Sequence, residues 1–135
     1  MTFTHRILFA CLAAWIALTV AGCGGGGGAS TSGPSISRTL TWSPPTAYQD
    51  NSPLDPGHDL AGYNIYIKSE EAPFSEQDAE IAVVAPGQTS LDLVPVCRLQ
   101  GLAGGTFHVS VRAIAMNGLM SEFSPTASFS LPDTL

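Results

Sequence analysis

The sequence from Thr106 to Ala115 is TFHVSVRAIA, and this stretch decides the fold class. Apolar side chains occupy every second position, and polar or basic side chains lie between them: the apolar set is Phe107, Val109, Val111 and Ala113. Successive side chains of a β-strand point to opposite faces of a sheet, so the alternation predicts a strand with one face in a hydrophobic core. A helix would instead repeat its apolar residues three and four positions apart.

The same alternation recurs along the chain between clusters of Pro, Gly, Asn and Asp. It predicts five further strands, at residues 38–42, 62–68, 80–85, 89–94 and 123–131. In the second of these, Tyr63 faces inward while Asn64, Tyr66 and Lys68 face outward. Short strands separated by turn residues are typical of an all-β sandwich or barrel.

Composition bounds the size and the charge of the protein. The 135 residues hold room for one domain. There are 11 acidic and 5 basic residues, and this balance disfavours nucleic acid as a partner. Low overall charge with 14 Gly and 10 Pro agrees with a turn-rich β domain.

The N-terminus carries a targeting pattern. His5 and Arg6 precede an apolar run from Ile7 to Val20, which is the order of a secretory signal and is shorter than a membrane-spanning helix requires. The segment Val20-Ala21-Gly22-Cys23 resembles the lipobox of bacterial lipoprotein precursors. The resemblance implies that residues 1–22 are a signal peptide cleaved after Gly22.

The same resemblance implies that Cys23 becomes the acylated first residue of the mature chain. Two or three palmitate-type acyl chains would anchor it stably to a membrane. Gly24 follows the cysteine where aspartate would favour the inner membrane, so we expect an extracytoplasmic, outer-membrane location. An uncleaved signal anchor or an ordinary secreted protein is the alternative. Residues 23–35 then form a flexible linker rich in Gly and Ser.

Residues 36–132 resemble a bacterial fibronectin type III domain. The resemblance rests on LTWSPPT at 40–46, LAGYNIY at 60–66, FHVSVRA at 107–113, and the segments 117–118 and 121–124. It implies an immunoglobulin-like two-sheet sandwich in which Trp42 and Tyr63 pack across the two sheets.

The chain departs from that family at two places. Little sequence precedes Leu40, so the first strand is expected to be short, at residues 35–37, or missing, which would leave a sheet edge that could accept another strand. Phe107 stands where the family usually has a tyrosine, so we expect the segment Val94–Gly105 to be less firmly held.

Neither the histidines nor the acidic residues suggest catalysis. The fold predicted here separates His58 from His108, and the spacing of Asp50, Asp55 and Asp59 matches no calcium loop, although ion binding stays an alternative. No nucleophile, zinc or phosphate-loop motif is present in the sequence. We expect a protein that is not an enzyme and that needs no metal or cofactor.

Cys97 is the one thiol expected in the mature domain. It is either a small buried hydrophobic side chain or the partner in an intermolecular disulfide.

Large apolar residues around the turn at Asn117 and Gly118 suggest a contact surface. Met116, Leu119 and Met120 lie at a predicted hairpin tip, beside Leu54 of the long loop between two strands. These four residues are the candidate partner-binding surface, and the alternative is that the two loops pack on each other.

The function expected from the sequence is therefore that of a membrane-anchored, non-catalytic lipoprotein. Its domain would contact an unidentified protein of the cell envelope or cell surface. One alternative is a carbohydrate-binding module, which would use exposed aromatic residues such as Tyr48 and Tyr66. Another is an accessory subunit of an envelope enzyme.

Overall fold

The computed structural model describes residues 17–19, for their backbone, and residues 38–134. The predicted signal peptide outside residues 17–19, Cys23, and the predicted linker and short first strand at 23–37 lie outside the described residues. The elements are β1 (Ala17–Thr19), β2 (Thr39–Thr41), β3 (Leu60–Lys68), β4 (Ala82–Val84), β5 (Ser90–Asp92), α1 (Leu93–Leu99), β6 (Gly105–Ala115) and β7 (Ala127–Leu131).

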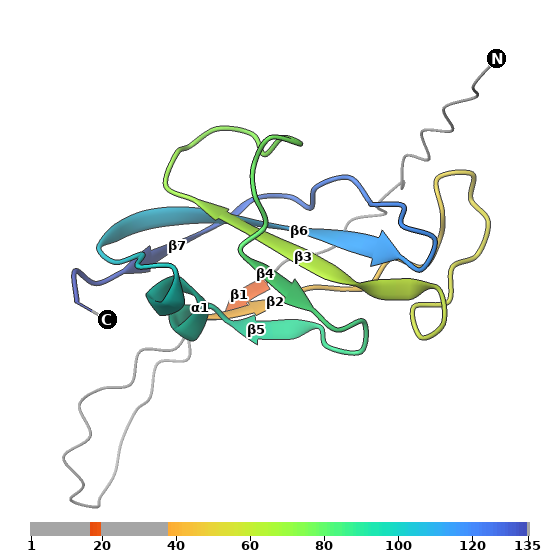
Figure 1. Cartoon of the computed structure of the whole chain (residues 1–135), viewed down its shortest axis with the longest axis horizontal. Coiled ribbons are helices and arrows are strands. Elements are labelled where there is room, and N and C mark those ends of the chain that lie inside the picture. Colours follow the sequence, from red (N-terminus) through yellow and green to blue (C-terminus); the bar gives the residue numbers. More distant parts are fainter. Residues whose placement is uncertain (1–16, 20–37, 135) are drawn as a thin grey trace, which may run out of the picture.

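The strands form two antiparallel sheets. One sheet has the order β1-β2-β5 and the other has the order β4-β3-β6-β7. The sheets face each other, with α1 at one end of the molecule and the long loop between β2 and β3 at the other (Figure 1). The predicted all-β, two-sheet sandwich is therefore confirmed. The chain crosses from one sheet to the other after β2, β4 and β5, as it does in immunoglobulin-like domains.

The central pair of the larger sheet follows the predicted alternation. The strands β3 and β6 pair from Leu60 opposite Ala115 to Lys68 opposite His108. Their inward side chains form the core with residues of β2, β5–α1 and β7: the buried apolar set includes Leu40, Trp42, Tyr63, Ile65, Leu93, Cys97, Phe107, Val109, Val111 and Phe129. The rings of Trp42 and Tyr63 meet edge to face, 5.3 Å between centroids.

The segment after β5 differs from the expectation. Residues 89–94 were predicted as one strand, but β5 ends at Asp92 and α1 begins at Leu93. Asp92 caps the helix by accepting a hydrogen bond from the backbone N–H of Val94. The helix ends in a Schellman motif, in which Gly101 has φ +68° and the N–H of Leu102 donates to the carbonyl of Cys97.

Apolar packing holds the segment after Val94. Leu93, Val94 and Cys97 face the core from α1, and the Phe107 ring stacks on Phe129 of β7 at 5.9 Å. The segment after Val94 is therefore held by apolar packing and by caps at both helix ends. The expectation of a loosely held segment did not foresee this helix.

The outward face of the larger sheet is covered. Tyr66 was predicted to face outward, and it does leave the core, but only 4% of it is exposed. Phe74 and Phe123 from two loops lie against its ring at 6.4 Å and 5.0 Å between centroids. Arg112 lies over Phe123 and donates to the carboxylate of Glu76, so this second apolar layer carries its own charged edge.

The strand β1 comes from the predicted signal peptide. It pairs antiparallel with β2 through Ala17 opposite Thr41 and Thr19 opposite Thr39. The edge of β2 that was expected to lie open is thus covered in the full-length chain by residues 17–19.

The burial of Leu40 gives a test of the core. Leu40 is fully buried, so Leu40→Ala should lower the free energy of unfolding by about 2 to 5 kcal/mol, through lost burial and the cavity left behind. Val83 is 68% exposed, so Val83→Ala should change it by less than about 0.5 kcal/mol. Urea unfolding followed by circular dichroism measures both. Equal effects of the two substitutions would contradict this core.

Candidate functional site

The predicted contact surface is partly buried. Met116 is 69% exposed, whereas Leu54 is only 4% exposed and belongs to the core. Leu119 and Met120 are half-buried, and Leu119 packs against the core. The exposed part of this surface is therefore Met116 with the outer parts of Leu119 and Met120, and Leu54 supports it from beneath.

One backbone hydrogen bond joins the two loops at this end, and another closes the hairpin itself. Met116 N–H donates to the carbonyl of Asp59 at 2.8 Å, and Ala115 N–H donates to the carbonyl of Leu119 at 2.8 Å. The alternative in which the loops pack on each other therefore describes the buried part of this surface, at Leu54 and Leu119. It leaves Met116 in contact with solvent.

The acidic residues of the long loop hold its turns. Asp50 accepts hydrogen bonds from Ser52, and these bonds lower the pKa of the Asp50 carboxyl group. Asp55 lies 2.7 Å from Nδ1 of His58, which lowers the pKa of Asp55 and raises that of His58. Asp59 accepts from the backbone N–H of Asp55. Within residues 38–134, no group of three or more His, Cys, Asp or Glu side chains is arranged to hold a metal ion.

The second histidine lies far from the first. His108 pairs with Lys68 at one end of β3, whereas His58 precedes Leu60 at the other end. Nδ1 of His108 lies 3.0 Å from the hydroxyl of Ser128. His108 lines an open groove of about 430 Å³ with Glu71 and Ser128. The structure does not bring the two histidines together.

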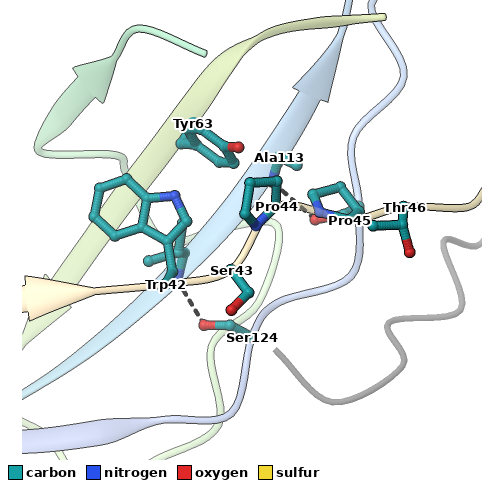
Figure 2. Close-up of a pocket in the computed structure, with 10 residues that line it drawn as sticks. Trp42, Ser43, Pro44, Pro45, Thr46, Tyr63, Ala113 and Ser124 are labelled. Carbon is teal, nitrogen blue, oxygen red and sulfur yellow. Dashed lines mark hydrogen bonds between the residues drawn. The ribbon is translucent and has the colours of Figure 1, made fainter. Parts of the chain in front are cut away.

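A pocket that the sequence analysis did not predict lies between the two sheets. Its volume is about 60 Å³, which is room for a few water molecules or for one small group of a ligand. The lining residues are Trp42, Ser43, Pro44, Pro45, Thr46, Tyr63, Val111, Ala113, Ser121 and Ser124. Figure 2 shows the Trp42 indole, the Tyr63 ring and the prolines around this space. None of these side chains is charged.

Two polar atoms of the pocket lack hydrogen-bond partners among the described residues. They are Nε1 of Trp42 and the hydroxyl of Tyr63, and both are buried. Burial raises the pKa of Tyr63. The Trp42 indole N–H opposes that rise, because it lies close to the hydroxyl although it does not meet hydrogen-bond geometry. A buried polar group without a partner costs about 1 to 3 kcal/mol, so such atoms usually meet water or a ligand. Ser124 and Ser121 differ, because their hydroxyls accept hydrogen bonds from the backbone N–H groups of Val111 and Ala113 in β6.

The sequence held a signal for this pocket. Trp42 and Tyr63 were interpreted as core anchors, and each does lie in the core. Each also carries a polar atom that needs a hydrogen-bond partner, which an apolar core does not supply. Pro44 and Pro45, which follow Trp42, have no backbone N–H to donate to such an atom.

Comparison with known proteins adds little. No family model and no curated protein matches the chain. Among solved structures, a β-1,2-glucanase from Parabacteroides distasonis is similar, with a TM-score of 0.47 and 18% identity. The match covers 73% of this chain and 11% of that one, so this chain spans about a tenth of its length. A likeness of this size carries no argument about function.

Cys97 lies in the core, on the inner face of α1. Its side chain is fully buried, and burial raises the pKa of the thiol to about 11. Both properties agree with a small hydrophobic side chain and oppose an intermolecular disulfide, because the thiolate is the species that reacts. In the described part of the chain, no helix is long and apolar enough to cross a membrane.

The state of Cys97 is open to a direct measurement. At pH 8 the native thiol should resist a chromogenic disulfide reagent, and it should react within minutes in 8 M urea, where the fold no longer shields it. The Cys97→Ala variant provides the blank. Rapid modification of the native protein, or a disulfide-linked dimer on a non-reducing gel, would contradict the buried thiol.

Proposed function

We propose that this chain is a bacterial lipoprotein, anchored through Cys23, whose fibronectin type III-like sandwich makes protein contacts in the cell envelope. The observation that carries the proposal is Val20-Ala21-Gly22-Cys23 directly after an apolar signal run. The Gly-rich residues that follow would separate the lipid from the domain. In this proposal the mature protein begins at Cys23 on the outer membrane.

The surface proposed for the contact is the β6–β7 hairpin tip at Met116. Met116 is 69% exposed, and the half-buried Leu119 and Met120 add apolar surface at the same tip. Contiguous exposed apolar surface is typical of interaction sites. Methionine adapts its shape to an irregular partner surface. Polar and acidic residues of the neighbouring loop, such as Asp55 and His58, would form the rim of the contact.

The carbohydrate-binding alternative has less support. It needs aromatic rings on the surface, but Tyr66 is 4% exposed beneath Phe74 and Phe123. Tyr48 is half-buried and packs against the core. We therefore favour protein contact over a glycan ligand.

The anchor is tested by replacing the acylated residue. Cys23→Ser should prevent incorporation of labelled palmitate and should move the protein from the membrane fraction to the soluble fraction, because the thiol that carries the lipid is gone. The matched control is Cys11→Ser, which removes a thiol within the predicted signal and should leave both readouts unchanged. If the Cys23→Ser protein stayed acylated and membrane-bound, the proposal would fail.

The contact surface is tested by crosslinking in intact cells. A photoreactive residue at position 116 should give a discrete crosslinked protein band, and Met120→Ser in the same chain should weaken it. The same photoreactive residue at Val83, which is exposed to a similar extent at 68%, serves as the control. Identical bands from the two positions, or none from position 116, would remove the hairpin as the contact surface.

A further inference from the structure

The edge of β2 ends beside the pocket. Thr41 pairs with Ala17 of β1, and the next two residues, Trp42 and Ser43, line the pocket. An extended chain that pairs with β2 and continues past the position of Ala17 therefore lies next to residues of the pocket.

Backbone geometry shows how a strand is held there. The carbonyl of Arg38 accepts from Leu93, and the N–H of Trp42 donates to Thr89, so these two residues direct backbone groups toward β5. Alternate residues of a strand direct them to opposite sides, so Thr39, Thr41 and Ser43 direct theirs toward β1. Pro44 and Pro45 then end the ladder, because proline has no N–H to donate.

The structure already contains one strand on this edge. Residues 17–19 pair with 39–41, which demonstrates that the edge accepts an antiparallel strand. The proposed cleavage after Gly22 removes these residues from the mature protein, and this part of the argument rests on the proposed function. The mature β2 edge then requires another strand or water for its backbone groups.

The pocket defines the chemistry of what arrives. No charged side chain lines it, its walls are apolar at Pro44, Val111 and Ala113, and its unpartnered polar atoms are Nε1 of Trp42 and the Tyr63 hydroxyl. The indole N–H is a donor only, so it requires an acceptor oxygen. A peptide carbonyl, or the oxygen of a small uncharged side chain, meets this requirement.

We propose that in the mature protein the β2 edge and the Trp42–Tyr63 pocket together bind an extended, uncharged peptide segment of a partner protein. The segment adds a strand antiparallel to β2 along residues 39–43. Its end places an acceptor oxygen in the pocket, where Trp42 donates to it. This contact is separate from the hairpin tip at Met116.

The test uses the mature protein, purified in detergent, with its N-terminus at Cys23 established by intact mass. The probe is a dye-labelled synthetic peptide with the sequence of residues 14–20, AWIALTV, followed by lysines for solubility. Fluorescence anisotropy should show saturable binding. N-methylation at the positions of Ala17 and Thr19, whose backbone N–H groups point toward β2, should abolish binding. N-methylation at the position of Leu18, whose N–H points away from β2, should be tolerated.

A second measurement addresses the pocket. The chain has two tryptophans, Trp15 and Trp42, so the mature protein has a single indole N–H resonance in a ¹⁵N spectrum, and unlabelled peptide should shift it. Trp42→Phe and Tyr63→Phe should each weaken binding by about 2-fold to 10-fold, the range of one hydrogen bond. Tyr66→Phe removes a hydroxyl from the opposite face of β3 and should not weaken it.

The possible outcomes separate the proposed peptide site from the lipoprotein proposal. No binding, equal binding of all N-methylated peptides, or full affinity in both pocket variants would overturn the proposed peptide site while leaving the lipoprotein proposal intact. If intact mass shows that residues 17–19 remain on the protein, the cleavage fails and the proposed open edge fails with it. The series of N-methylated peptides uses the protein with its wild-type sequence, so its result does not depend on the folding of any variant.

Discussion

The edge-to-face contact between Trp42 and Tyr63 joins the two sheets of the sandwich. Trp42 follows β2 and is tied to the residue before β5 by its hydrogen bond to Thr89, while Tyr63 pairs with Val84 of β4 and Ala113 of β6. The ring contact therefore links the sheet that contains β2 and β5 to the sheet that contains β3, β4 and β6. Such a contact contributes about 0.5 to 1.5 kcal/mol beyond the area it buries, and it fixes which faces of the sheets oppose each other.

The same contact brings two polar atoms into the core. Two aromatic rings bring an indole N–H and a hydroxyl between the sheets. Among the described residues neither atom has a partner, whereas the hydroxyls of Ser121 and Ser124 there are hydrogen-bonded. In the proposed peptide site, packing and recognition therefore depend on the same two residues. The sequence interpretation of Trp42 and Tyr63 as core residues agrees with their burial, but the sequence did not show that their polar atoms would lack partners among the described residues.

Local pattern predicted the strands and missed what depends on distant segments. Alternation located β6 within one residue, because its pattern is a property of the strand itself. It extended β5 into α1, because Leu91, Asp92 and Leu93 continue the alternation, although Asp92 and Gly101 carried the signals of helix ends. Alternation also placed Tyr66 on the outer face, yet nothing near it in sequence could show that Phe74 and Phe123 cover that face. The pocket likewise requires residues from β2, β3 and β6 together.

A short strand edge and a small pocket would bind a peptide weakly by themselves. Each hydrogen bond contributes only about 0.5 to 1.5 kcal/mol net, and β2 offers few of them before Pro44 ends the pairing. In the proposed lipoprotein, the anchor at Cys23 changes this balance. A tethered domain meets an envelope partner at a raised effective concentration, and a second contact at Met116 would add its free energy within the same complex. Location and recognition would then depend on each other, and cleavage after Gly22 would both anchor the domain and uncover its binding edge.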